Sequence, residues 1–124
     1  MSSRKGNEFE NEIATYLSDQ LTGLKVSRTP MSGGGFTDVQ MPDVYGTPDI
    51  WVEAKRTERL AVYPAMSQAE AGIAERQAAD MPVVISRKNR MPTEDSLVVM
   101  RLKDWTALYK THLEQSGHLK RTTD

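Results

Sequence analysis

The segment from residue 41 to residue 55 constrains the fold of this chain most, because its pattern predicts a tight β-hairpin. Residues 41–46 and residues 50–55 carry the β-branched and aromatic side chains typical of strands, and the turn-forming residues Thr47, Pro48 and Asp49 separate them. A loop this short joins two strands that lie side by side and run in opposite directions. The hairpin therefore brings residues before the loop opposite residues after it.

Side chains along the second strand sort onto two faces, because successive residues of a strand point in opposite directions. Ile50, Val52 and Ala54 share one face, which we assign to the core. The opposite face carries Trp51, Glu53 and Lys55. We expect Trp51 to fill a groove between a helix and the sheet, which leaves an acid and an ammonium group side by side.

Two acids face each other across the predicted hairpin. With a three-residue loop, Val44 opposes Val52 and Asp43 opposes Glu53. Directly opposed residues have Cβ atoms about 4.5–5.5 Å apart, and like charges at that distance are destabilising unless a positive group lies between them. A hard divalent cation with oxygen ligands at about 2.0–2.6 Å fits that gap. Asp43 and Glu53 are therefore candidate metal ligands.

Asp49 is the rival acid, because it also follows a proline and precedes Glu53. Its distance from Glu53 along one strand is about 13 Å, which is too long for both side chains to bind one ion. We assign Asp49 to the turn. This choice depends on the three-residue loop, since a wider loop changes which residue faces Glu53.

The remaining elements follow from hydrophobic spacing and turn residues. Apolar residues at helical spacing predict helices over residues 7–24 and 64–79, and Asp104 can cap a last helix whose Trp105 and Tyr109 we expect in the core. Short apolar runs predict further strands over residues 24–29, 82–86 and 96–102. The order is helix, three strands, helix, two strands, helix. It predicts an α/β fold with a mixed central sheet flanked by helices.

The first helix carries one acid on its inward side. Taking about 100° per residue, Glu10 falls inside the apolar stripe. The stripe consists of Phe9, Ile13, Tyr16, Leu17, Leu21 and Leu24. The acids on the solvent side are Glu8, Glu12 and Asp19. Glu10 can be a partner of the helix dipole or a further carboxylate of the site, and the sequence leaves both interpretations open.

Composition limits the class of protein. The 124 residues, 38% of them hydrophobic and 27% charged, suit one globular domain over residues 1–124 with a frayed tail over residues 116–124. The absence of cysteine excludes disulfides, thiolate nucleophiles and Cys-type zinc sites. No apolar run approaches the roughly 18 residues of a membrane span, and the N-terminus is too polar for a signal peptide, so we expect a cytoplasmic protein. The net charge of −1 confines any nucleic-acid contact to local basic clusters.

With these motifs the chain resembles the PD-(D/E)XK nuclease superfamily, and within it the archaeal-type and phage Holliday junction resolvases. The matching pieces are residues 5–13 of the first helix, the Ser32-Gly33-Gly34 loop, Pro42-Asp43-Val44, Glu53-Ala54-Lys55 and Gln68. The resemblance covers residues 5–102 in element order. It implies a restriction-endonuclease-like αβββαβ core, to which this chain adds a C-terminal helix.

The resemblance also implies roles for individual residues. The ligands of Mg²⁺ or Mn²⁺ would be Asp43, Glu53, the carbonyl of Ala54 and Glu10. Lys55 would orient the attacking water and stabilise the charge of the transition state, and Gln68 would help to position the water, the metal or Lys55. Candidate DNA contacts are Arg4, Lys5, Arg28, Ser32, Gly33, Gly34, Arg56 and Arg90.

Three functions are compatible with these residues. A Holliday junction resolvase is expected to be a homodimer, because two symmetric cuts need two active sites, and the mildly apolar residues 61–66 are a candidate subunit contact. It would act in the host cytoplasm if a phage encodes it. A phage nicking or replication-associated nuclease without junction preference is the nearest alternative. A non-cleaving nucleic-acid-binding protein with a nuclease fold is the other, but the intact Asp43, Glu53 and Lys55 argue against it.

Overall fold

The elements of the structure follow one another in the predicted order. This computed structural model describes residues 4–30 and 40–121, with side chains from residue 8 onward. The helices are α1 (Arg4–Gln20), α2 (Val62–Arg76) and α3 (Leu102–Gln115), and the strands are β1 (Ser27–Arg28), β2 (Val44–Tyr45), β3 (Ile50–Arg56), β4 (Met81–Arg87) and β5 (Leu97–Met100). A short 3₁₀ turn, η1 (Thr93–Asp95), precedes β5 and was not predicted. None of the helices in this described part has the length and apolarity of a membrane span.

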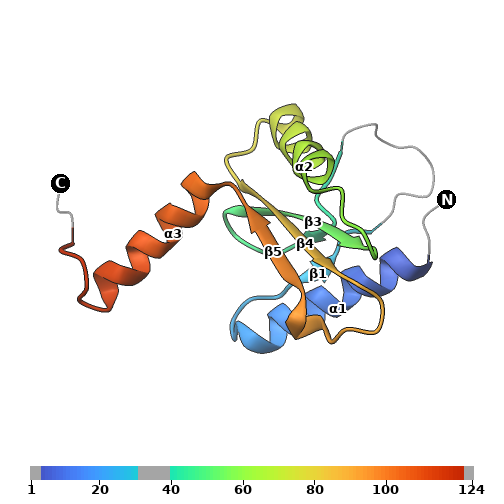
Figure 1. The fold of residues 1–124 in the computed structure, drawn as a ribbon, viewed down its shortest axis with the longest axis horizontal. Helices are drawn as coiled ribbons and strands as arrows, with labels where there is room; N and C mark the ends of the chain where they lie inside the picture. Colours follow the sequence, from blue (N-terminus) through green and yellow to red (C-terminus); the bar gives the residue numbers. More distant parts are fainter. Residues whose placement is uncertain (1–3, 31–39, 122–124) are drawn as a thin grey trace.

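The five strands of the described residues form one mixed sheet in the order β1-β2-β3-β4-β5. β3 and β4 are parallel, and the other neighbouring pairs are antiparallel. The helix α2 connects β3 to β4 and covers one face of the sheet, while α1 covers the other face (Figure 1). The predicted α/β fold with a restriction-endonuclease-like αβββαβ core and a C-terminal helix is confirmed.

Both faces of β3 are buried, because a helix covers each of them. On the α1 side, Phe9 and Ile13 pack on the predicted core face, where Val52 is fully buried. On the α2 side, Trp51 is 2% exposed and lies against Gly72, where an added Cβ atom would come within 2.5 Å of Cζ2 of the indole. The glycine inside α2 therefore makes room for Trp51, which fills the groove between helix and sheet as predicted.

The hairpin has the predicted register. Val44 of β2 pairs with Val52 of β3. Asp49 lies in the turn between the strands, as assigned, and has a φ of 71°. Gly46 has a φ of 89° and lies against the backbone carbonyl of Lys25, where any Cβ atom would clash. The short loop therefore holds the two strands in the alignment that the sequence predicted.

The stripe predicted for the first helix is partly wrong. The helix α1 ends before Leu21, so Leu21 and Leu24 leave it and are 44% and 37% exposed, and Tyr16, at the edge of the buried arc, is 38% exposed. Glu12, assigned to the solvent side, forms an ion pair with the buried Arg87 of β4. Arg87 is 75 positions away in the sequence. Helical spacing alone carries no information on such a partner.

The last helix is not part of the core, so the prediction for Trp105 and Tyr109 is wrong. The helix α3 begins at Leu102, two residues before the expected cap Asp104, and runs away from the sheet (Figure 1). None of its residues is buried, and Trp105 and Tyr109 are 48% and 45% exposed. The apolar spacing predicted the helix correctly, but it does not tell whether the apolar side meets the same chain.

Candidate active site

Asp43 is fixed against the edge of β3 at the point where β2 begins. Its backbone N–H donates to the carbonyl of Val52 at 2.8 Å, and its Oδ2 accepts a hydrogen bond from the N–H of Ala54 at 2.7 Å. The Asp43 carboxylate thus lies in the plane of the sheet, between the two helix layers. The predicted hairpin register brings it beside Glu53, the residue between its two backbone partners.

Glu53 and Lys55 lie on the α2 side of β3. The Glu53 side chain is buried, with 3% of its surface exposed, and the Lys55 ammonium lies 3.5 Å from its Oε2. The same ammonium donates to Oε1 of Gln68 on α2 at 3.0 Å. Gln40, a residue that no sequence pattern singled out, donates from Nε2 to the backbone carbonyl of Gln68 at 3.1 Å. Lys55 is therefore held between an acid of the strand and an amide of the helix.

Glu10 reaches the site from the opposite helix layer. It lies on α1 with 15% of its side chain exposed, so its predicted inward orientation is confirmed. Its Oε1 lies 4.0 Å from Nη1 of Arg28 on β1, and the charge of Asp43 contributes to the raised pKa of its carboxyl. This coupling to Asp43 favours a carboxylate of the site over a simple partner of the helix dipole.

The three carboxyl groups resist full ionisation. Burial, and then the charge of Asp43, raise the pKa values of both Glu10 and Glu53 to about 7. Burial also raises the pKa of Asp43, against the opposing effects of the Ala54 N–H and of the Lys55 ammonium. When ionised, the three carboxyl groups thus carry more negative charge than the neighbouring basic groups neutralise. A bound divalent cation would neutralise this excess.

The oxygen donors at this edge suit a hard cation, although they do not form a complete cage as they stand. Within residues 4–30 and 40–121, no three Asp, Glu or His side chains are arranged to hold a metal ion. The N–H of Ala54 faces Asp43, and the N–H and C=O of one strand residue point to the same side. The Ala54 carbonyl therefore lies along the edge that Asp43 occupies. Two carboxylates, this carbonyl and water would meet the needs of Mg²⁺ or Mn²⁺.

We expect the metal-free protein to lose stability as the pH rises from about 4.5 to about 7. In this range Glu10 and Glu53, whose pKa values rise from the ordinary 4.5 to about 7 on folding, hold protons in the folded chain that the unfolded chain has released. The folded state binds more protons, so raising the pH favours unfolding. Melting temperatures in EDTA at several pH values measure the effect. The fall in melting temperature with pH should be smaller for Glu53→Gln, whereas the control Glu94→Gln should keep the wild-type fall. A wild-type melting temperature that rises over this range would contradict the expectation.

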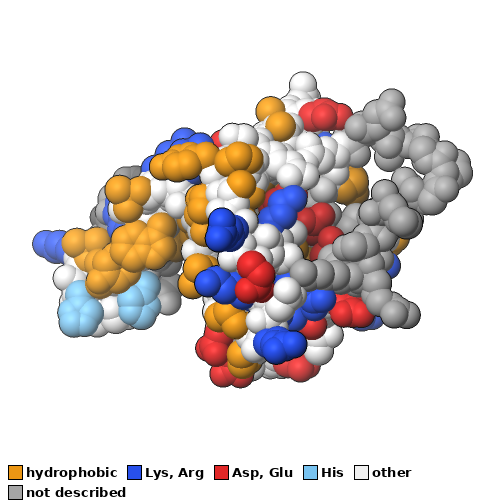
Figure 2. Space-filling view, turned by 45° about the vertical axis from the view of Figure 1, so that its right-hand side comes forward, with side chains coloured by type: hydrophobic (Ala, Val, Ile, Leu, Met, Phe, Trp, Pro, Cys, Tyr) orange, Lys and Arg blue, Asp and Glu red, His pale blue; other side chains and the backbone are white. Residues whose placement is uncertain are grey.

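Two of the predicted DNA contacts are paired with acids of α1. Arg28 lies beside Glu10, and Nη1 of Arg56 lies 3.7 Å from Oε2 of Glu8. Arg90 is exposed on the loop after β4. Acidic and basic side chains are interleaved over the face shown in Figure 2, so any phosphate contact is local. The side chains of Arg4 and Lys5, and the loop residues Ser32, Gly33 and Gly34, lie outside the described part of the chain.

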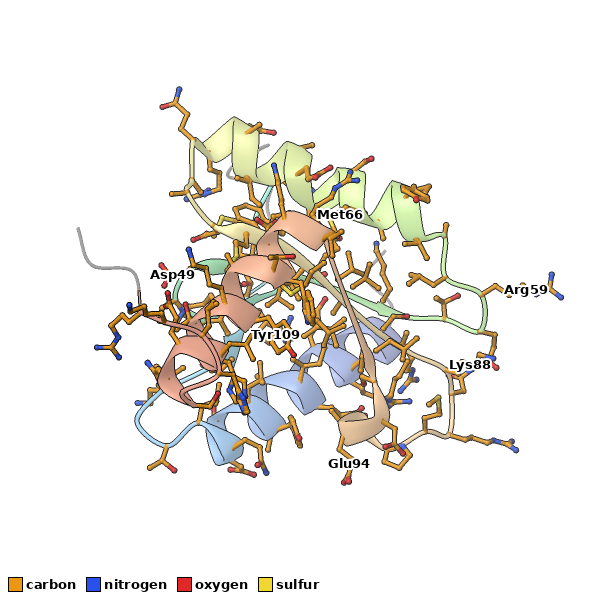
Figure 3. The ribbon with its side chains drawn as sticks, turned by 60° about the vertical axis from the view of Figure 1, so that its left-hand side comes forward. Asp49, Arg59, Met66, Lys88, Glu94 and Tyr109 are labelled. Carbon is orange, nitrogen blue, oxygen red and sulfur yellow. The ribbon has the colours of Figure 1, made fainter. Side chains whose placement is uncertain are left out.

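A groove opens beside the lysine of the site. It has a volume of about 290 Å³, and its lining includes Lys55, Gln68 and Arg59. Arg59 lies on the loop after β3, and in Figure 3 it and Lys88 lie at one end of the molecule, opposite Asp49. The sequence placed Arg59 in a local basic cluster with Lys55 and Arg56, but its place in this groove depends on how the loop returns to α2.

The comparison with protein families agrees with the geometry of the site. The chain matches the family model described as "Phage putative PDDEXK endonuclease" over residues 1–123. No curated protein and no solved structure matches it. The family match spans almost the whole chain and includes the two acids and the lysine of the predicted motif. The chain therefore belongs to this family of phage PDDEXK endonucleases.

Proposed function

We propose that this nuclease is a divalent-metal-dependent DNA endonuclease with its active site at Asp43, Glu53 and Lys55. The observation that carries the proposal is the contact of Asp43 with Ala54, which holds one acid beside the Glu53-Ala54-Lys55 strand. A buried glutamate, a half-buried aspartate and a lysine at one sheet edge would be costly for stability alone. The same groups suit the hydrolysis of a phosphodiester.

Each residue has a defined task in this proposal. Asp43, Glu53 and the Ala54 carbonyl would hold Mg²⁺ or Mn²⁺, and Glu10 would complete the carboxylate set from α1. When bound, the ion would supply a Lewis acid for the phosphate and would lower the pKa of a water molecule. Lys55 orients that water and stabilises charge that develops on the phosphate, and Gln68 positions Lys55 through the hydrogen bond at 3.0 Å.

The groove beside Lys55 gives the DNA strand a path to the site. A nucleotide next to the scissile phosphate fits the space lined by Arg59 and Gln68, and Arg59 contacts its phosphate. Arg90 extends this contact on the loop after β4. Arg28 and Arg56 contribute less net charge, because each lies beside a glutamate of α1. Arg4, Lys5 and the Ser32-Gly33-Gly34 loop remain candidate contacts from the sequence.

Within this class we propose a structure-specific Holliday junction resolvase that acts as a homodimer. The similarity of the helix acid, the glycine loop and the motif strand to phage and archaeal-type resolvases supports this substrate. A nicking or replication-associated nuclease without junction preference is the second candidate, since the same active site serves both. A non-cleaving binding protein is disfavoured by the intact acids and Lys55.

One cleavage assay separates these functions. Labelled four-way junction, nicked, flap and linear duplex DNA are incubated with the protein and Mg²⁺ or Mn²⁺, and with EDTA as the control. Paired symmetric cuts on the junction, absent in EDTA, are the expected result. Cuts on nicked or flap DNA without junction preference would favour the second candidate. A folded wild-type protein that cuts no substrate with either metal would overturn the enzyme proposal.

A further inference from the structure

The helix α3 exposes an apolar side that its own chain does not cover. Four of its five large apolar residues, Leu102, Trp105, Leu108 and Tyr109, are 75%, 48%, 49% and 45% exposed. The rings of Trp105 and Tyr109 lie 4.8 Å apart, and Tyr109 stacks further on His112 at 6.4 Å. Figure 2 shows orange side chains gathered along this helix beside the pale-blue histidines. An isolated helix of fourteen residues is marginal in water, so a partner for this side would stabilise it.

The apolar side is broad and carries no full charge. Leu102, Trp105, Tyr109 and His112 follow the 3–4–3 spacing of a helix seam, with Leu108 and Leu113 on its flanks. The charged residues of the helix are Lys103, Asp104, Lys110 and Glu114. At about 100° per residue all of them fall well away from the centre of the seam. The separation of an apolar side from a charged side is typical of a helix that packs against another protein surface.

The apolar surface continues from α3 onto the body of the molecule. At the base of the helix, Leu102 lines a hollow of about 220 Å³ together with Val62, Tyr63 and Met66 of α2. Tyr63 is 74% exposed and Val62 is 38% exposed. At the base of α3, Arg101 donates from Nε and Nη2 to the two carboxylate oxygens of Glu70 on α2 at 2.9 and 3.1 Å. The apolar side of the helix is therefore continuous with the hollow at its base.

We propose that this surface, the α3 seam with its basal hollow, binds a second copy of the chain. In a two-fold dimer the same patch meets itself, so charges near the axis would meet their own like charges, and a seam without full charges avoids that repulsion. The six exposed side chains of the surface offer on the order of 600 Å² per protomer, enough for an interface above the threshold of about 1,000 Å² in total. The partner assignment rests on the homodimer of the proposed function, because paired cutting requires two active sites.

The test is the molar mass of the full-length protein in solution, measured by sedimentation across a range of concentrations. We expect a dimer for the wild type, and for Trp105→Glu a dissociation constant raised by at least about 30-fold. Ala107→Glu is the matched control, because residue 107 lies on the opposite side of α3 and receives the same charge. The control should remain a dimer. Circular dichroism and melting temperature show whether each variant folds.

The outcomes distinguish a failure of the dimer-surface proposal from a failure of the nuclease proposal. A monomeric wild type at all concentrations, or a Trp105→Glu dimer as tight as that of the control, would overturn the assignment even if the protein cuts DNA. A folded protein that forms the dimer but cuts nothing would instead overturn the nuclease proposal. If both hold, the folded Trp105→Glu variant should nick single strands and lose the paired cuts that the Ala107→Glu control retains.

Discussion

Glu53→Gln and Asp43→Asn are each expected to abolish DNA cleavage, while Asp49→Asn keeps most of the wild-type rate. Each of the first two changes removes a carboxylate from the edge of β3 where a cation would bind, and a neutral amide is a weak ligand for Mg²⁺. Both amides are close in size to the acids they replace, and each removes a group whose burial disfavours its charge. The loss of activity should therefore come without a loss of stability.

Asp49 is the control that makes this prediction specific, because it also follows a proline and precedes the Glu-Ala-Lys tripeptide. It lies in the hairpin turn, where it has a φ of 71° and its carbonyl accepts the N–H of Met81 at 2.8 Å. Asparagine tolerates this left-handed conformation as well as aspartate does. Initial cleavage rates on junction DNA at saturating Mg²⁺ compare the three variants, and isothermal titration with Mg²⁺ reports binding separately. An inactive Asp49→Asn beside an active Asp43→Asn would refute the hairpin assignment.

The hairpin could be predicted from sequence because its determinants are local. Strand alternation assigns Glu53 and Lys55 to one face, and the short loop sets which residue before it opposes Glu53. The register that places Asp43 opposite Glu53 is the one that brings two acids together. The observed pairing of Val44 with Val52 belongs to that register. The same local rules placed Trp51 against a helix, although they could not identify Gly72 as the residue that makes room for it.

The features that the sequence did not predict depend on contacts between distant segments. Gln40 hydrogen-bonds to Gln68 of α2, 28 positions later in the sequence, and Glu12 pairs with Arg87, 75 positions later. No periodicity links such residues. The helix α3 has the spacing of a core helix, yet its apolar side is exposed in the single chain. A hydrophobic pattern reports that a surface is to be buried and says nothing about which chain buries it.

Lys55→Gln is expected to lower kcat about 10²- to 10³-fold, because the ammonium lies 3.5 Å from Oε2 of Glu53 and lines the groove where the phosphate would lie. Gln68→Ala should have a smaller effect of the same kind. It leaves the ammonium in place and removes only the hydrogen bond at 3.0 Å that orients it. Single-turnover cleavage of junction DNA, measured as a function of DNA concentration, separates kcat from KM for both variants.

Two roles of Lys55 must be told apart in that experiment, because the ammonium also lowers the pKa of Glu53. Without it, Glu53 holds its proton to a higher pH, so the variant should bind Mg²⁺ more weakly near neutral pH and recover part of its rate as the pH or the Mg²⁺ concentration rises. The part that returns measures the effect on metal binding. A deficit that persists at saturating Mg²⁺ and high pH measures the direct action of the ammonium on the water and the phosphate. Full recovery would mean that Lys55 serves only to keep Glu53 ionised.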